Sequence, residues 1–337
     1  YEPIEGPKVL DAQIEALARA LVSAERPLIL TGGGVVRTQT GPMARAIGDA
    51  VGAVFMHSLT ASNVTGSPHS LGTAGGFTPE DRLPAVRAAD MVLILGATSN
   101  NFQTRKGQLF GTDNIHRVDL NDRWNLSLPQ ANTVFGDLTD VLPRLLAAVE
   151  KLHPKQSTYR DELVDLVDHD TIDQEPRYGS DGRLNPRHVA AELDTILPSN
   201  RQIVVDGGHF MAWIAERVEI PDPASFIGVG TAFQSIGLGF GSAVGASVGS
   251  PEKFTVCVSG DGGGQMALAD LATFIETTEH GAVVIINDAA YGAEIHQYAV
   301  LGADPTAMYL PQLDFAAIGQ AMGATGITVN TMEDLEV

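Results

Sequence analysis

Short apolar runs that end at glycine alternate along this chain with stretches of helical periodicity. The run Leu28–Thr31 stops at three glycines, Gly32–Gly34, and the run Met91–Leu95 stops at a further glycine. Between such runs, apolar residues recur at intervals of three and four, as in residues 9–22 and 138–149. Short buried strands that alternate with helices of roughly 10–15 residues are typical of βαβ units. The sequence therefore predicts an α/β fold with doubly wound parallel sheets.

The same pattern occurs twice, with a polar connection between the two occurrences. At roughly 150 residues per domain, a chain of 337 residues corresponds to about two domains. Residues 151–175 are charged and polar and contain no glycine, whereas a second series of predicted strands begins near Asn185. We expect a Rossmann-like domain over 1–150, a linker over 151–184 and a second domain over 185–337.

Composition excludes several classes of protein. Acidic residues outnumber basic ones by 41 to 21, and because binding to nucleic acid needs clustered Lys and Arg, we expect no such partner. No apolar run reaches the ~18 residues of a membrane span, and the N-terminal residues lack a signal-peptide core, so we expect no membrane attachment. The single cysteine, Cys257, excludes an internal disulfide and favours a reducing, cytoplasmic location.

Two aspartates follow consecutive predicted strands in the C-terminal half. Asp261 comes after the strand at 254–259, and Asp288 comes after the strand at 282–287. Parallel strands joined by a helix end at the same edge of a sheet, so we expect the two carboxylates to lie together there. Adjacent carboxylates repel each other unless a cation separates them, and such oxygen ligands suit Mg²⁺ or Ca²⁺; Mg²⁺ usually completes its coordination with phosphate oxygens and water. The pattern therefore predicts a Mg²⁺-bridged phosphate ligand.

Glycine is abundant, at 36 residues, and three glycines follow the first of these aspartates. Gly262–Gly264 precede a helix that we expect to start near Gln265. That arrangement leaves backbone N–H groups free to bind an anion. The tripeptide Gly260-Asp261-Gly262 alone is also common in ordinary turns, so the prediction depends on the second aspartate and the flanking strands.

These residues resemble the cofactor motif of the thiamine diphosphate-dependent enzymes of the acetohydroxyacid synthase and 2-oxo acid decarboxylase type. That motif opens with Gly-Asp-Gly and closes with Asn-Asn; Gly260-Asp261-Gly262 and Asn287-Asp288 stand at these places. The resemblance implies that Asp261 and Asp288 are side-chain ligands of Mg²⁺ and that Ala290 offers its backbone carbonyl. Cofactor contacts implied in the same way are those of Gly260, Gly262, Gly263, Tyr291 and Gly292. Asp288 departs from the motif, because the family usually has Asn at this position. Its carboxylate adds a negative charge beside the diphosphate, which leaves the metal preference open.

Two further segments agree with that family. Residues 230–241 look like its glycine-rich stretch, in which a bulky apolar side chain wedges between the two cofactor rings and bends the cofactor; Ile236 stands at that position. The alternative is that Ile236 is a core residue of a tightly packed helix. Residues 205–210 resemble the loop that receives the diphosphate, which implies hydrogen bonds from Gly207, Gly208 and His209. His209 is equally compatible with an ordinary surface histidine.

Glu294 follows the second aspartate at a position that differs among members of the family. Relatives of pyruvate decarboxylase carry a glutamate there that transfers protons during decarboxylation and product release. Acetohydroxyacid synthases usually carry an apolar residue at this position. The resemblance thus implies a catalytic role for Glu294, with its pKa raised beside a cofactor in a closed site. The alternative is a solvated glutamate in the first turn of a helix, where the dipole favours it. His296 is interpreted as a neighbour on that helix.

The N-terminal half looks like the central domain of the same family, which holds FAD or ADP in some members. Gly32–Gly34 follow a strand but do not form a GxGxxG pattern, and no acidic partner for a ribose follows at the expected distance. Residues 96–101 lack the arginine of the FAD-binding relatives. We therefore expect no FAD and interpret the three glycines as a structural turn.

The resemblance covers two of the three domains of such enzymes. The pyrimidine-binding domain, which would supply the glutamate that activates the cofactor, is expected before Tyr1 or on a partner chain. We expect an inactive fragment of a homodimer or homotetramer whose substrate is a small 2-oxo acid. Glu294 favours decarboxylation, and acetolactate synthase-like carboligation is the alternative. A catalytically silent module that binds nucleotide or Mg²⁺-diphosphate is an alternative of another class, while an NAD-dependent dehydrogenase would need a nucleotide fingerprint that we do not find.

Overall fold

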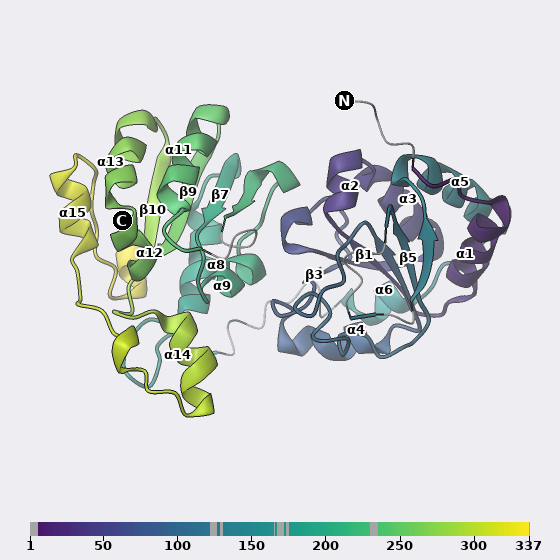
Figure 1. Cartoon of the computed structure of the whole chain (residues 1–337), viewed down its shortest axis with the longest axis horizontal. Coiled ribbons are helices and arrows are strands. Elements are labelled where there is room, and N and C mark those ends of the chain that lie inside the picture. The colour runs from purple at the N-terminus through teal and green to yellow at the C-terminus, as the bar shows by residue number, and fades with distance from the viewer. Residues whose placement is uncertain are drawn as a thin grey trace. The chain divides into compact units, whose positions relative to one another are not determined.

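The chain forms two compact units, Tyr1–Asp170 (unit 1) and Thr171–Val337 (unit 2), each built on its own parallel sheet. Figure 1 shows the computed structural model, which describes residues 6–121, 127–128, 131–164, 166, 172, 175–229 and 235–336. Every strand pair in both sheets is parallel, so the predicted α/β fold is confirmed. The predicted limits of the domains at 150 and 185 stay a prediction.

Unit 1 contains a six-stranded sheet in the order β3-β2-β1-β4-β5-β6. Its strands are β1 (Pro27–Thr31), β2 (Val54–His57), β3 (Ser70–Thr73), β4 (Met91–Leu95), β5 (Ile115–Asp119) and β6 (Asn132–Phe135). Its helices are α1 (Asp11–Ser23), α2 (Gly33–Thr38), α3 (Gly41–Val51), α4 (Leu83–Ala88), α5 (Leu138–Lys151) and α6 (Tyr159–Glu162), with short 3₁₀ turns η1 (Leu59–Ala61) and η2 (Glu80–Arg82). The strand order reverses direction between β1 and β4, as in a doubly wound sheet.

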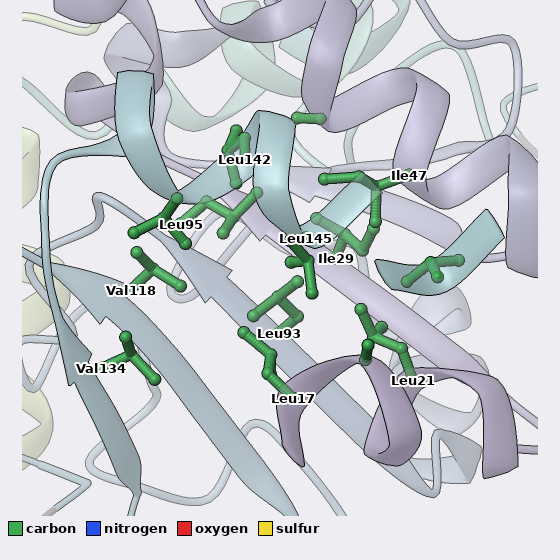
Figure 2. Close-up of a cluster of buried hydrophobic side chains, with 14 of the residues drawn as sticks. Leu17, Leu21, Ile29, Ile47, Leu93, Leu95, Val118, Val134, Leu142 and Leu145 are labelled. Carbon is green, nitrogen blue, oxygen red and sulfur yellow. The ribbon is translucent and has the colours of Figure 1, made fainter. Parts of the chain in front are cut away.

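Successive residues of the central strands enter different hydrophobic clusters. Leu28 and Leu30 belong to one cluster, whereas Ile29 belongs to the other. Because neighbouring side chains of a strand point to opposite faces, both faces of this sheet are covered. Figure 2 shows one of these clusters, to which side chains of α1, α3 and α5 contribute together with those of the strands. It includes Leu17, Leu21, Ile47, Leu93, Leu142 and Leu145, each contributing roughly 1.5–3 kcal/mol by burial.

The glycines after β1 bring two backbone segments into contact. Gly32 donates its N–H to the carbonyl of Leu95, and Gly34 donates to the carbonyl of Gly96, both at 2.9 Å. A Cβ at Gly32 would lie 2.4 Å from the Gly96 oxygen, and one at Gly34 would lie 2.7 Å from the Gly96 Cα. Gly33 and Gly34 form the first turn of α2, so these glycines serve a strand-to-helix junction. The structure does not test the expectation about FAD.

We predict that Gly32→Ala destabilises unit 1. The new methyl group would overlap backbone atoms of Gly96 and Ala97, which cannot move without disturbing β4, and such overpacking typically costs about 1–3 kcal/mol. Gly33→Ala is the matched control, since its methyl would meet side-chain atoms alone, at 3.1 Å from the end of Arg37 and 4.0 Å from the hydroxyl of Thr60. Urea unfolding of both variants measures the difference; equal free energies of unfolding would contradict the packing argument.

Unit 2 contains a four-stranded sheet in the order β10-β9-β7-β8. Its strands are β7 (Arg201–Val205), β8 (Phe226–Gly228), β9 (Phe254–Gly260) and β10 (Gly281–Ile286). Its helices are α8 (Pro186–Ile196), α9 (Met211–Arg217), α11 (Gly239–Gly249), α12 (Asp261–Met266), α13 (Leu268–Thr277), α14 (Gly292–Tyr298) and α15 (Phe315–Ala321), with 3₁₀ turns η4 (Pro223–Ser225), η5 (Ala299–Leu301), η6 (Thr306–Met308) and η7 (Met332–Glu336). α11 and α13 run alongside β9 (Figure 1), and their apolar side chains form the core with those of β7 and β9. Within the described ranges of both units, no helix is long and apolar enough to cross a membrane.

One helix boundary at the predicted site was wrong. The helix expected to start near Gln265 begins at Asp261 and is divided at Ala267 into α12 and α13. Glycine is a poor helix former, so local propensity argued against a helix through Gly262–Gly264. Close packing of these glycines against neighbouring segments favours the helical conformation instead.

Candidate functional site

Three strand ends of unit 2 meet at one edge of its sheet. β9 lies between β7 and β10, with Val258 beside Val205 and Gly260 beside Ile286. The loops that leave this edge are 206–210, 260–264 and 287–292. Because the carboxyl ends of parallel strands are where open α/β sheets bind ligands, this edge is the candidate site.

Asp261 is the first residue of α12 and is almost wholly buried, with an exposed fraction of 1%. Its Oδ2 atom has no hydrogen-bond partner among the described residues. Burial, and then the negative charge of Asp288, raises the pKa of Asp261 to about 6. The structure thus brings the two predicted aspartates together. A buried carboxylate oxygen without a partner, next to a second carboxylate, is unfavourable unless a cation neutralises the pair.

Asp288 also faces the loop that follows β7. Nε2 of His209 lies 3.8 Å from Oδ2 of Asp288. Burial lowers the pKa of His209, and the charge of Asp288 opposes this shift. A Cβ at Gly292 would lie 2.5 Å from Oδ2 of Asp288 and 2.5 Å from Cε1 of His209, so only glycine allows this contact. The predicted diphosphate-loop histidine and the predicted metal ligand are therefore neighbours.

The backbone around Asp288 is held by a later segment of the chain. Asn287 donates from Nδ2 to the carbonyl of Leu313 at 2.9 Å. Ala289 has φ 56°, in the left-handed region, and Ala290 forms an antiparallel bridge with Tyr309. Two backbone hydrogen bonds, of 2.7 and 2.8 Å, flank this bridge. Ala290, whose backbone carbonyl is a Mg²⁺ ligand by the resemblance, is thus held by hydrogen bonds of the residues before and after it.

The glycines of the predicted motif make room for neighbouring segments. A Cβ at Gly262 would lie 2.5 Å from Cε1 of Tyr291, and a Cβ at Gly263 would lie 2.5 Å from Oδ2 of Asp206. A Cβ at Gly260 would lie 3.1 Å from the ring of Phe210. The N–H groups in the first turn of a helix have no intrahelical partner, so α12 directs backbone donors to this edge. Glycine here allows close packing of the protein itself, beyond the ligand approach that the sequence suggested.

Ile236 lies in the turn before α11 and is half-buried. The next residue, Gly237, has φ 79°, a conformation that strongly favours glycine. Ile236 therefore precedes the small-residue helix instead of packing within it, and its wedge role stays a prediction. Residues 230–234 of the glycine-rich stretch lie outside the described residues.

Glu294 and His296 both lie on α14 and are exposed in the described structure. The ring of His296 lies 5.1 Å from that of His209, and the charge of Glu294 acts on His209. Both side chains therefore border the loop of the predicted diphosphate end. The catalytic role of Glu294, and the closed site that this role requires, stay predictions.

Asp206 is the residue at this edge that sequence reasoning missed. It follows β7 directly and is wholly buried. The sequence did contain a signal, because Asp206, like Asp261, is an aspartate placed immediately beyond a buried strand. Two of its partners are backbone N–H groups of residues about 30 positions later in the chain, which no motif records.

Comparison with known protein families agrees with this geometry. The family model "Thiamine pyrophosphate enzyme, central domain" matches residues 14–145, and "Thiamine pyrophosphate enzyme, C-terminal TPP binding domain" matches residues 206–337. The chain belongs to the thiamine pyrophosphate enzymes. The matched C-terminal segment contains all three loops of the candidate site, so this site lies in the TPP binding domain of the family.

Curated thiamine pyrophosphate enzymes of several kinds are similar to this chain. Mouse 2-hydroxyacyl-CoA lyase 2 is 26% identical over 97% of the chain and 52% of its own length. Sulfoacetaldehyde acetyltransferase from Castellaniella defragrans is 24% identical over 96% of the chain and 58% of its own length. Acetolactate synthase from Mycobacterium avium is 24% identical over 99% of the chain and 55% of its own length. The chain therefore spans about half the length of these relatives.

The residues at the site fit the family's cofactor carried by a divalent cation. Among the described residues, no group of three or more His, Cys, Asp or Glu could hold a metal ion alone. Mg²⁺ is usually bound by one or two carboxylates and completes its coordination with phosphate oxygens and water. Asp261 and Asp288, with the buried Oδ2 of Asp261 unpaired, are two neighbouring carboxylates that fit such an incomplete set of ligands. A diphosphate would supply the oxygens that the protein lacks.

Proposed function

We propose that this chain comprises the central and diphosphate-binding domains of a thiamine diphosphate- and Mg²⁺-dependent enzyme that acts on a 2-oxo acid. When bound at these residues, that cofactor would supply a nucleophilic carbon and an acceptor for the electron pair left by decarboxylation. The protein's own part is to bind, bend and orient that cofactor. The observation that carries this proposal is the pairing of Asp261 with Asp288 at the carboxyl edge of the sheet, with one buried oxygen of Asp261 unpaired.

Each part of the site has a proposed role. Asp261, Asp288 and the carbonyl of Ala290 would hold Mg²⁺. Gly208 and His209 would donate to the diphosphate, whereas the N–H of Gly207, also implied by the resemblance, is donated to Oδ1 of Asp206 at 2.8 Å. Further contacts to the cofactor would come from Gly260, Gly262, Gly263, Tyr291 and Gly292. Ile236 would act by shape, holding the two rings of the cofactor in a bent conformation. Because net charge is −20, an anionic diphosphate needs the cation and these N–H groups to bind at all.

The fate of the decarboxylated substrate distinguishes two candidate reactions. A proton donor at Glu294, which borders the site on α14, favours decarboxylation with release of an aldehyde. The similarity to acetolactate synthase and sulfoacetaldehyde acetyltransferase favours transfer to a second acceptor. Both reactions need the same bound cofactor and the same loss of CO₂ from the substrate, so the same cofactor-binding residues serve both.

We further propose that a pyrimidine-binding domain, from elsewhere in the protein or from a partner subunit, completes the site. The relatives are about twice as long as this chain, and Glu294 and His296 are exposed beside the candidate site. The active protein would then be a homodimer or homotetramer, and this chain alone would be inactive. Its cytoplasmic location stays a prediction from the single cysteine.

Calorimetry with thiamine diphosphate and Mg²⁺ tests the proposal. The chain is expected to bind the pair together, and Asp261→Ala is expected to lose at least about tenfold in affinity, since a metal ligand is removed. Glu276→Gln is the matched control, because Glu276 is an exposed carboxylate on α13 of the same unit. Equal binding by wild type and Asp261→Ala would refute the metal assignment, and no binding by the wild-type chain would contradict the proposed diphosphate-binding role.

A further inference from the structure

Asp206 connects three separate segments of unit 2 through one carboxylate. Its Oδ1 accepts hydrogen bonds from the N–H groups of Gly207 at 2.8 Å and Leu238 at 3.3 Å. Its Oδ2 accepts from the N–H of Gly237 at 2.9 Å and from the hydroxyl of Ser259 at 3.1 Å. These donors belong to the loop after β7, the turn before α11 and the end of β9. The carboxylate thus fixes the separations between these segments.

All these donors are electrically neutral. Among the described residues, no Lys, Arg or His lies within ion-pair distance of Asp206, although the side chain is wholly buried. A buried carboxylate is costly unless hydrogen bonds compensate its charge, and neutral hydrophobic packing would stabilise this position equally well or better. A carboxylate at this position is therefore better explained by the geometry that it imposes on the turn than by a gain in stability.

The turn that Asp206 holds is the one that carries Ile236. Gly237 and Leu238 are the two residues after Ile236, and both donate their N–H groups to the same carboxylate. Gly237 adopts φ 79°, so the chain reverses direction directly after Ile236. With both following peptides fixed, the Cα–Cβ direction of Ile236 is fixed relative to β7 and β9.

α12 packs against the carboxylate of Asp206 as well. A Cβ at Gly263 would lie 2.5 Å from Oδ2 of Asp206 and 3.2 Å from the N atom of Gly237. The predicted anion-binding turn of α12 and the turn of Ile236 therefore share Asp206 as their common contact. Displacing this side chain would move the two turns relative to each other.

We propose that Asp206 is a positioning residue that holds Ile236 at a fixed place relative to the diphosphate end of the site; this inference rests on the proposed function. Asp206 does not touch the cofactor. Oδ2 holds the turn of Ile236 through the N–H of Gly237, while Oδ1 holds Gly207 in the diphosphate loop. Loss of the Oδ2 acceptor alone therefore affects the recognition of the rings and not that of the diphosphate.

Comparison of two ligands tests this inference. Asp206→Asn keeps the shape of the side chain but replaces one acceptor oxygen by an NH₂ group. Ser259 can reverse its role and accept from that group, whereas the N–H of Gly237 cannot, so the turn of Ile236 is released. We expect the affinity for Mg²⁺ with thiamine diphosphate to fall by about tenfold, as for a lost buried hydrogen bond, and that for Mg²⁺ with inorganic diphosphate to stay unchanged. Faster amide hydrogen exchange at Gly237, with β9 and α13 unaffected, is the second readout.

A second variant keeps the inference testable if Asp206→Asn fails to fold. Gly237→Ala leaves Asp206 in place but strains the left-handed turn, with the new methyl 2.9 Å from Cβ of Met266, and is expected to show the same ligand-selective loss. Gly245→Ala on α11, where a methyl meets nothing within 4 Å, is the matched control. Equal loss for both ligands, or no loss for either, would overturn the inference. Failure of the wild-type chain to bind thiamine diphosphate would instead refute the proposed function and the inference with it.

Discussion

Asp261→Asn is expected to raise the free energy of unfolding of the metal-free chain at pH 7.5, by up to about 3 kcal/mol. Asp261 is buried beside Asp288 with one oxygen unpaired, and its pKa is about 6 against an ordinary value of 3.8. At pH 7.5 the native chain must therefore keep an unfavourable negative charge, which asparagine of the same shape does not carry. Urea unfolding of both proteins in the presence of a chelator measures the difference.

The sign of the pH dependence follows from the raised pKa. Between about pH 4 and pH 6 the native chain binds more protons at Asp261 than the unfolded chain does, so wild-type stability falls as the pH rises through this window. The advantage of Asp261→Asn is thus expected to be full above the folded-state pKa and to vanish near pH 4. Acidification also relieves the net charge of −20, but this acts on both proteins, so their difference is the readout.

Ligand addition should reverse the order of stability. Mg²⁺ with thiamine diphosphate is expected to stabilise the wild type more than Asp261→Asn, because a ligand that binds the native state raises its stability in proportion to the logarithm of its affinity. The control Glu276→Gln should show neither the pH-dependent difference nor the loss of ligand stabilisation. An advantage of Asp261→Asn that does not change with pH would mean that the charge of Asp261 is not the cause.

The pairing of Asp261 with Asp288 could be predicted from sequence because it depends on two local rules. Each aspartate follows a short apolar run, and a helix between two such runs makes the strands parallel neighbours. The observed register, with Gly260 beside Ile286, leaves Asp261 one residue and Asp288 two residues beyond this pair, so both lie at the same edge of the sheet. No distant part of the chain had to be placed for this prediction.

The contacts of Asp206 and His209 could not be predicted in that way. Asp206 accepts hydrogen bonds from Gly237 and Leu238 only because the turn before α11 lies against the end of β7. No local sequence pattern predicts where that turn lies. Likewise, the 3.8 Å approach of His209 to Asp288 requires β7 and β10 to lie on either side of β9. A sequence motif identifies the residues of one loop, whereas the contacts of this site join residues of different loops.

Glycine was the residue type whose role changed most. The sequence suggested that the glycines of the motif make room for a ligand, and it placed them outside a helix. In the structure, Gly262 and Gly263 lie inside α12 and make room for Tyr291 and Asp206. The tertiary contact decides the conformation here, since glycine on its own disfavours a helix by about 1 kcal/mol relative to alanine.

Glu294→Gln in the full-length enzyme is expected to lower the release of aldehyde from pyruvate, used as the test 2-oxo acid, by roughly 100-fold to 10,000-fold. Glutamine has the shape of glutamate but cannot transfer a proton, and Glu294 lies on α14 beside the candidate site. Cofactor affinity should stay nearly unchanged, because Glu294 is exposed and the proposed ligands of Mg²⁺ and diphosphate are other residues. Aldehyde release and calorimetric affinity are measured on the same preparation.

The products of this variant also separate the two candidate reactions. If Glu294 delivers the proton that ends decarboxylation, its loss should leave the activated substrate to react with a second carbonyl, so the ratio of ligated product to aldehyde rises. Glu276→Gln should change neither rate nor ratio. A variant with unaltered turnover and product ratio would show that Glu294 is a solvated residue in the first turn of α14, where the helix dipole alone accounts for its presence.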